Sequence, residues 1–359
     1  MEKVSSTEEV EKKRMRTIKP SDSIMEYALN QVEKRMKQTV SGVLQNKLTG
    51  AVLKQALAVR GKMLRPQMLI LSAFLVDEKR AADHMDELVR WASIIELSHT
   101  ASLLHDDVID NSFVRRGRAT VMKLYGNSSA VYAGDSLLAC ILRVVLESHG
   151  EDKALLLTDG IEEMCIGEIN QTRCKYQHKV SVEQYNENIA GKTGVLFAAA
   201  CSLGAMEVTQ QQEMIERYEQ LGRKLGRAFQ LRDDLLDLTS STEEAGKMVM
   251  QDFREGIYTL PVLLARDHER FGTEVKKLMK KNQKGNLGES ELKRLKEILI
   301  ESRAIEEVTE EVNQLLEECK SITAASSCQW AKERAGIMLD KLKIGGGNFE
   351  YTCLYQTGS

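Results

Sequence analysis

Residues 96–110 read ELSHTASLLHDDVID and hold three aspartates, Asp106, Asp107 and Asp110, in an Asp-Asp-x-x-Asp group. The residues before the group are apolar or small, which is typical of a buried helix rather than a solvated one. At about 100° per residue, Asp106 and Asp110 project within about 40° of each other, and Asp107 flanks them. Like charges on one helical face repel each other unless a cation lies among them. Hard oxygen ligands favour Mg²⁺, which bridges carboxylates to substrate phosphates.

A second group repeats this arrangement further along the chain. Residues 231–237 read LRDDLLD, with aspartates at Asp233, Asp234 and Asp237, and the first aspartates of the two groups lie 127 residues apart (233 − 106). A solvated acidic turn is the alternative for one such group, but two matched groups make it the weaker interpretation. The sequence therefore predicts two metal-carboxylate stations.

Basic residues lie near both groups in the sequence. The stretch GKMLRP at 61–66 places Lys62 and Arg65 at a predicted helix start, where unpaired backbone N–H groups already favour anions. Arg115 and Arg116 follow the first aspartate group directly, and arginine forks suit phosphate oxygens. For each cluster alone, a surface charge pair is the alternative.

Further polar residues complete the candidate site. The stretch GKTG at 191–194 offers Lys192 and Thr193 where the backbone can approach closely, although Thr193 can also cap a helix. His99 lies seven residues before Asp106 on the same face, which makes a substrate contact plausible, whereas a core or capping role is the default for His105. Two more residues flank the second aspartate group: Gln230 and Lys247.

The rest of the chain predicts helices. Only three prolines occur in 359 residues, and apolar residues recur three and four positions apart. Glycine-rich or polar breaks, among them Gly61, 111–117, Gly126 and 191–194, divide the pattern into roughly ten helices with no convincing strand. We expect a single all-α domain over 21–344, a bundle of helices around a central cavity, between a flexible polar N-terminus (1–20) and a loose tail (345–359).

Composition narrows the class of protein. A net charge of −3 does not favour nucleic acid as a partner, and the seven cysteines form no Cys-x-x-Cys pair, which indicates reduced thiols. The N-terminus is charged and has no apolar core, so it does not resemble a secretory signal. The longest nearly apolar run, 195–206, is shorter than the ~20 residues of a membrane span. These features predict a cytoplasmic protein with no transmembrane span.

Taken together, the stretches GKMLRP, ELSHTASLLHDDVID, RRGRAT, GKTGVLF and FQLRDDLLD, followed by GK and TLP, resemble the trans-isoprenyl diphosphate synthases, or polyprenyl synthetases, from about Gly61 to Pro261. The resemblance implies an all-α fold, usually dimeric, and head-to-tail addition of isopentenyl diphosphate to an allylic diphosphate. It implies that the six aspartates bind about three Mg²⁺ ions. By the same resemblance, isopentenyl diphosphate would be bound by Lys62, Arg65, His99 and Arg116, and the allylic diphosphate by Arg115, Lys192, Thr193, Gln230 and Lys247.

The chain departs from the family at Ile257, where many relatives carry a lysine, so one allylic-diphosphate cation is missing. The usual basic ending of the carboxyl tail is also absent. Three alternatives stay open: a synthase of short product length such as a farnesyl or geranylgeranyl diphosphate synthase, a class I terpene cyclase, and a non-enzymatic subunit of a heteromeric synthase. Both aspartate groups and the cations at 62, 65 and 116 argue against the last two.

Product length is predicted from the helix that ends at Asp106. Ala101 and Ser102 lie one turn before it and are small, and the small Ser98 follows along the same face. In the family, bulky aromatic residues here stop growth at short products. We expect the branched Ile95, with Ile94 and then Trp91, to close the far end of the product tunnel, about 16–22 Å from Asp106. The alternative is that the small residues are close helix contacts. We expect a long-chain product, beyond about twenty carbons.

Overall fold

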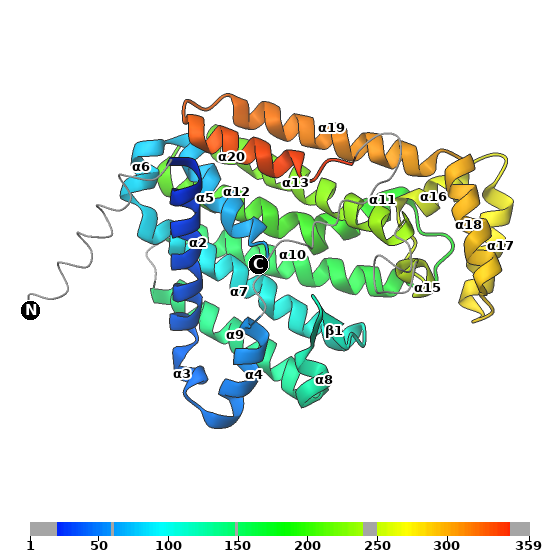
Figure 1. The fold of residues 1–359 in the computed structure, drawn as a ribbon, viewed down its shortest axis with the longest axis horizontal. Coiled ribbons are helices and arrows are strands. Elements are labelled where there is room, and N and C mark those ends of the chain that lie inside the picture. Colours follow the sequence, from blue (N-terminus) through cyan, green and yellow to red (C-terminus); the bar gives the residue numbers. More distant parts are fainter. Residues whose placement is uncertain (1–19, 59–60, 148–149, 240–249, 345–359) are drawn as a thin grey trace, which may run out of the picture. The chain divides into compact units, whose positions relative to one another are not determined.

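A computed structural model describes residues 20–58, 61–147, 150–239 and 250–344, and 81% of them are helical (Figure 1). The expected all-α fold is confirmed. The predicted N-terminus and tail lie outside the described residues, except that the first helix already begins at Pro20. The helices up to residue 174 are α2 (Pro20–Thr39), α3 (Ser41–Leu44), α4 (Lys47–Leu57), α5 (Leu64–Val76), α6 (Glu78–Asp83), α7 (Met85–Ile109), α8 (Val121–Tyr125), α9 (Asn127–Glu147) and α10 (Glu151–Cys174). Those that follow are α11 (Val182–Ile189), η1 (Ala190–Gly194), α12 (Val195–Val208), α13 (Gln212–Thr239), α15 (Gln251–Arg254), α16 (Leu260–Asp267), α17 (Gly272–Gln283), α18 (Glu289–Glu301), α19 (Ala304–Ala324) and α20 (Gln329–Asp340).

Contacts between residues divide the chain into two compact units. Unit 1 lies within residues 1–161, 196–222 and 322–337, and unit 2 lies within 162–195, 223–321 and 338–359. Five of the described helices contribute residues to both units: α10, α12, α13, α19 and α20. The expected single domain over 21–344 and its central cavity stay predictions.

Helix α7 is the centre of unit 1. It packs against α2, α5 and α9, and α9 runs along it in Figure 1. Its buried side chains include Leu88, Trp91 and Ile95, which are spaced three and four residues apart. Burial of this apolar face holds the helix in place, because each large aliphatic or aromatic side chain contributes about 1.5–3 kcal/mol when removed from water. The aspartates at its C-terminal end are thereby fixed to the core of unit 1.

A short hairpin follows α7, where the sequence analysis expected no strand. Strand β1 (Val114–Arg115) pairs antiparallel with β2 (Arg118–Ala119). Arg116 and Gly117 form the connecting turn, and both have positive φ angles, as a two-residue hairpin turn of the primed type requires. The helix does break within 111–117 as predicted, but the chain there forms a hairpin that carries Arg115 and Arg116.

The break predicted at 191–194 is wrong. Helix α11, the π turn η1 and helix α12 follow one another without interruption, so that Val182–Val208 is one helix. Glycine is unfavourable in a helix by about 1 kcal/mol, but at Gly191 there is no room for a side chain, because an added Cβ would lie 2.9 Å from the Glu163 carbonyl oxygen. A π turn inside an α-helix is rare and often marks a functional site.

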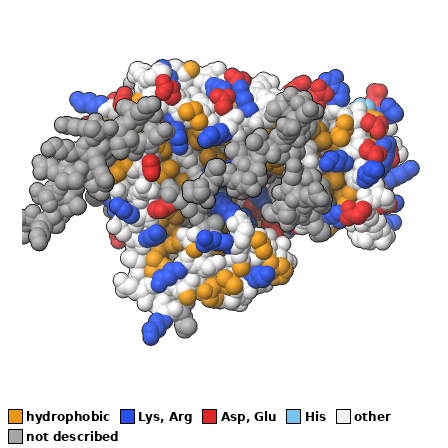
Figure 2. Space-filling view, viewed as in Figure 1, with side chains coloured by type: hydrophobic (Ala, Val, Ile, Leu, Met, Phe, Trp, Pro, Cys, Tyr) orange, Lys and Arg blue, Asp and Glu red, His pale blue; other side chains and the backbone are white. Residues whose placement is uncertain are grey.

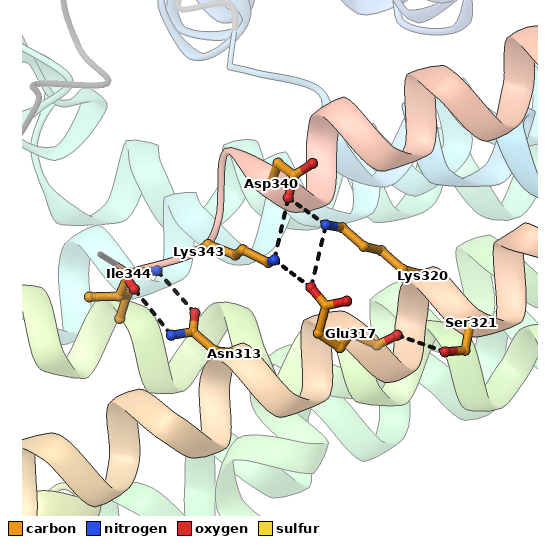
Figure 3. Close-up of polar contacts among 7 residues, drawn as sticks. All are labelled: Asn313, Glu317, Lys320, Ser321, Asp340, Lys343 and Ile344. Carbon is orange, nitrogen blue, oxygen red and sulfur yellow. Dashed lines mark hydrogen bonds and ion pairs between the residues drawn. The ribbon is translucent and has the colours of Figure 1, made fainter. Parts of the chain in front are cut away.

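In unit 2, helices α16, α17 and α18 pack on one another. A polar cluster joins the residues of α19 and α20 that belong to this unit (Figure 3). Asn313 exchanges two hydrogen bonds with the backbone of Ile344 (3.1 and 3.2 Å), and Lys320 pairs with Asp340. These contacts fix the last described residues of the chain to α19.

Two helical stretches of the described chain are long and apolar enough to cross a membrane, by length and composition alone: α9 and Val182–Val208. The second is longer than the sequence analysis expected because the π turn continues it. It is mostly buried within the protein, as core helices of this composition are. The six described cysteines are free thiols, as predicted.

Candidate active site

The first aspartate group lies at the C-terminal end of α7, in unit 1. Asp107 is 5% exposed, Asp106 is half-buried, and Asp110, whose backbone N–H donates to the Asp106 carbonyl (2.8 Å), ends the helix exposed. Burial raises the pKa of Asp107, and its neighbour Arg115 opposes the rise. The three carboxylates thus lie within about one helical turn of each other but differ in exposure, from the buried Asp107 to the exposed Asp110.

The hairpin brings Arg115 to this group. Its Nε donates to the Asp107 Oδ1 at 2.7 Å. A buried carboxylate without a partner would be strongly destabilising, and the guanidinium supplies both charge and hydrogen bond. The predicted proximity of an arginine to the first aspartate group is therefore present in the fold.

The other predicted cations of unit 1 also come together. Arg116 lies against Gly61, where an added Cβ would be only 2.4 Å from the guanidinium Nη1. Lys62 is exposed beside this glycine, and Arg65 begins α5 with its guanidinium 4.5 Å from the ring centre of Phe197. Residues 55 positions apart in the sequence (116 − 61) are thus in contact.

Two buried titratable groups face these cations. Burial raises the pKa of Glu96, and the charges of Arg65 and Arg116 oppose that rise. Burial lowers the pKa of His99 well below its ordinary value, and the same two arginines and Arg115 lower it further. His99 is therefore neutral at pH 7 and can exchange hydrogen bonds with a substrate without adding charge. His105 instead packs on α9, with Nε2 3.3 Å from Asp135 Oδ1, which agrees with the structural role expected for it.

The second aspartate group lies in unit 2, on the last turns of α13. Asp234 is 2% exposed, and its carboxylate accepts hydrogen bonds from the Tyr185 hydroxyl and from Gln230 Nε2 (2.8 Å). Burial raises the pKa of Asp234 to about 6, while these two donors oppose the rise. Asp233 is exposed.

Asp237 of the same group binds the backbone of a neighbouring helix. Its two carboxylate oxygens accept from the N–H groups of Gln251 (2.9 Å) and Asp252 (3.1 Å). It therefore holds the first residues of α15 next to the second aspartate group. Lys247 lies outside the described residues.

The π turn η1 brings its polar residues to this group. Lys192 Nζ lies 3.0 Å from Glu168 Oε1 on α10. The Thr193 hydroxyl donates to Gln230 Oε1 (2.7 Å), and Gln230 in turn donates to Asp234. Three residues that the sequence analysis assigned to one substrate therefore lie together in one unit.

Sequence reasoning missed four residues of these two sites: Glu96, Glu168, Tyr185 and Asp252. Burial raises the pKa of Asp252 well above its ordinary value, Asp237 and Asp234 raise it further, and Lys192 opposes the rise. Only Asp252 had a usable signal, as an acidic residue shortly after the second group. Glu96 and Tyr185 have no sequence feature that separates them from other helix residues. The sequence spacing of Glu168 and Lys192 does not indicate that their side chains pair.

The donor atoms of both groups fit a hard divalent cation. The groups offer carboxylate oxygens only, and Mg²⁺ takes one or two carboxylates together with waters and substrate phosphates. Among the described residues no three His, Cys, Asp or Glu side chains form a cage around a common point. The aspartates fit an ion that is completed by a diphosphate better than one held by protein alone.

The residues predicted to set product length lie in the core of unit 1. Ala101, Ser98 and Ile95 are fully or almost fully buried, and Ser102 is half-buried. The hydroxyls of both serines donate to backbone carbonyls of α7 itself, from Ser98 to Ile94 and from Ser102 to His99 (both 2.9 Å). Ala101, Ser98 and Ser102 therefore give this face of α7 small side chains. Because both serine hydroxyls are paired, the face is effectively apolar.

Comparison with known proteins places this geometry in a family. Residues 46–299 match the polyprenyl synthetase family model. The chain belongs to the polyprenyl synthetase family. It is accordingly a prenyltransferase.

Individual relatives agree with this. The chain is 32% identical to a prenyl transferase of Cyanidium caldarium, covering 80% of this chain and 86% of that one. It is 36% identical to component 2 of the heptaprenyl diphosphate synthase of Geobacillus stearothermophilus, over 62% and 68% of the two chains. The crystal structure of a polyprenyl synthase from Caulobacter crescentus, complexed with calcium and isoprenyl diphosphate, is 28% identical, with a TM-score of 0.77 over 89% and 95%.

In this polyprenyl synthetase we expect the buried carboxylate of Asp234, a candidate metal ligand, to lower the stability of the native state. Its pKa is raised to about 6, above the ordinary 3.8, so the native state loses stability as pH rises through that range and the carboxyl ionises. Asp234→Asn should therefore stabilise the metal-free protein by about 2 to 3 kcal/mol at pH 8, and the gain should vanish near pH 4. Chemical denaturation in EDTA measures it.

Asp233→Asn is the matched control, because the neighbouring carboxylate is exposed. It should change the free energy of unfolding by less than about 0.5 kcal/mol at either pH. An Asp234→Asn variant that is less stable than wild type at pH 8 would contradict the conclusion that burial of this charge destabilises the native state.

Proposed function

We propose that this polyprenyl synthetase condenses isopentenyl diphosphate with an allylic prenyl diphosphate and produces an all-trans polyprenyl diphosphate longer than about twenty carbons. The observation that carries the proposal is that each unit holds an Asp-Asp-x-x-Asp group with a cation beside it. Arg115 binds Asp107 in unit 1, and Lys192 lies near Asp234 in unit 2. A relative named as a heptaprenyl diphosphate synthase component supports the longer product.

The two substrates are assigned to different residues. The cations around Gly61, namely Lys62, Arg65 and Arg116, bind the diphosphate of isopentenyl diphosphate, and the neutral His99 contacts it by hydrogen bonding. The allylic diphosphate is held by Arg115, Lys192, Thr193 and Gln230. Lys247 belongs to the same proposed set, although it lies outside the described residues.

In this proposal the aspartates of both groups would hold Mg²⁺, about three ions in all. Bound Mg²⁺ would supply positive charge that stabilises the leaving diphosphate when the allylic C–O bond ionises. The protein's own contribution is to hold that diphosphate with Lys192 and Thr193 and to surround the carbocation with apolar side chains, which exclude water. The double bond of isopentenyl diphosphate then attacks, and a proton leaves to the released diphosphate.

No side chain need act as general base in this scheme. His99 is neutral but lies among arginines, which would oppose its protonation. The buried carboxylates Asp107 and Asp234 already have hydrogen-bond partners. The cytoplasmic location inferred from the sequence stays a prediction.

We further propose that the chain acts as a homodimer. Unit 1 exposes large apolar side chains on α8 and α9, including Leu124, Tyr132 (72% exposed) and Leu146 (86% exposed). Figure 2 shows apolar side chains gathered on the lower part of this view, over α4 and α8. A second copy suits this face better than a bilayer, because Asp135 lies exposed in the middle of α9 and a charge there is costly in lipid.

The first prediction for the proposed function concerns the two aspartate groups. Asp106→Ala and Asp233→Ala should each lower turnover by orders of magnitude, because each removes a metal ligand, while the helical circular dichroism stays that of wild type. Asp83→Ala, which removes an exposed carboxylate on α6 outside both groups, is the control and should keep wild-type turnover. A group whose variant keeps more than about a tenth of wild-type activity does not bind an essential metal.

The second prediction concerns product length. Ala101 is 1% exposed on the face of α7 that leads away from Asp106, so Ala101→Phe should place a ring across the path of the growing chain and shorten the product sharply. Ser98→Phe, about one turn further from Asp106, should shorten it less. Mass spectrometry of the products measures both. A wild-type product of about fifteen or twenty carbons would contradict the prediction.

The third prediction concerns the dimer. Light scattering should give wild type about twice the 40.4 kDa of one chain, and Leu146→Glu should give the monomer mass because it places a charge in the apolar face. Ile300→Glu changes another exposed apolar residue (60% exposed), on α18, and should leave the dimer intact. A monomeric wild type that gains activity only with a different subunit would contradict the homodimer.

A further inference from the structure

The π turn η1 carries Lys192 and Thr193. It contacts the backbones of two other helices, α10 and α13. Lys192 points to α10, where Glu168 accepts its ion pair at 3.0 Å. Thr193 points to α13, where Gln230 accepts its hydrogen bond at 2.7 Å. The side chains of one short turn are thus held by two different helices, so the position of both depends on how closely these helices approach the turn.

The approach of α10 depends on a glycine. A Cβ added to Gly167 would lie 2.5 Å from the Lys192 backbone nitrogen, a distance that no real side chain tolerates. Gly191 has the reciprocal contact, since its added Cβ would lie 2.9 Å from the Glu163 carbonyl oxygen. The backbones of α10 and η1 are therefore in direct contact. Gly167 is also the residue immediately before Glu168, the partner of Lys192.

The approach of α13 depends on a second glycine. A Cβ added to Gly226 would lie 2.6 Å from the Gly194 Cα. Gly226 lies four residues before Gln230, the partner of Thr193, on the same face of the helix. Each helix thus places a glycine against the turn and, beside that glycine, the side chain that binds the turn.

On one side the turn borders an open pocket of about 250 Å³, lined in part by Ile189, Ala190 and Gly194. Side chains do not fill the space on that side of the turn. Loss of one contact would leave the turn free to shift toward the pocket.

From these contacts we infer that Gly167 and Gly226 are positioning residues for the allylic diphosphate. They clamp η1 between α10 and α13 and so fix the Lys192 ammonium and the Thr193 hydroxyl at the second aspartate group. The inference deepens the proposed function, on which the substrate assignment of Lys192 and Thr193 rests. Displacement of such groups by about 1 Å can cost about a hundredfold in rate.

The structure provides controls that separate positioning from packing. Gly222 lies one turn before Gly226 on α13, and its added Cβ would lie 2.4 Å from the Phe197 carbonyl oxygen of α12, three residues after the end of η1 (197 − 194). Gly222→Ala should therefore destabilise the protein as Gly226→Ala does, without disturbing the turn. Gly194 lies within the turn, but its added Cβ would meet only the Ile189 carbonyl at 3.7 Å, an ordinary contact. Gly194→Ala should be tolerated.

Steady-state kinetics with farnesyl diphosphate as primer tests the inference. Gly167→Ala and Gly226→Ala should raise KM for farnesyl diphosphate at least tenfold and leave KM for isopentenyl diphosphate within about twofold. That selective loss corresponds to one charge-assisted contact. Gly222→Ala and Gly194→Ala should raise neither KM by more than about twofold. Equal changes for both substrates, or equal behaviour of Gly222→Ala and Gly226→Ala, would overturn the inference.

Hydrogen exchange gives a second readout that needs no turnover. In the metal-free protein, Gly167→Ala and Gly226→Ala should lose protection of the backbone amides of 190–194, whereas Gly222→Ala and Gly194→Ala should keep it. This result is expected even if wild type elongates no allylic diphosphate, an outcome that would refute the proposed function alone. If Gly167→Ala and Gly226→Ala do not fold while Gly222→Ala does, the glycines serve folding and the inference is wrong.

Discussion

Burial of negative charge at the ends of apolar helices is the constraint on which the rest of this structure depends. Asp107 and Asp234 are both almost inaccessible to water, and ionised carboxylates in such places are costly unless they are paired and hydrogen-bonded. The protein meets that cost differently in the two units. A guanidinium from the hairpin binds Asp107, whereas a tyrosine hydroxyl and a glutamine amide bind Asp234. Each buried aspartate is followed or preceded by a more exposed one, so part of each group remains open to a ligand.

This arrangement explains why cations and amides surround both groups without neutralising them completely. The pKa of Asp234 is still raised to about 6 after its two hydrogen bonds, so the native state keeps an electrostatic strain that a divalent ion would relieve. Stability given up at a binding site is the usual exchange for function. The nearby Asp252, whose pKa is raised well above its ordinary value, adds to the same excess of negative charge.

Much of the site could be read from the sequence, because its strongest signals are local. The Asp-Asp-x-x-Asp spacing places carboxylates on one helical face, and the structure does place both groups at the C-terminal ends of α7 and α13. The contacts that support them could not be predicted, because they join residues far apart in the sequence. Nothing in a helix of ordinary composition marks Tyr185 as the partner of Asp234, or Glu168 as the partner of Lys192. The glycines at 191 and 194 were read as a break for the same reason: glycine usually ends a helix, and only the neighbouring backbone shows why it continues here.

We propose that this chain by itself transfers prenyl groups with the help of a divalent metal. The decisive measurement is incorporation of labelled isopentenyl diphosphate by the purified chain alone, with an allylic diphosphate and Mg²⁺. We expect labelled polyprenyl diphosphate when Mg²⁺ is present and none when EDTA is added before the substrates. Absence of product with Mg²⁺ from a folded chain, or equal product in EDTA, would contradict it.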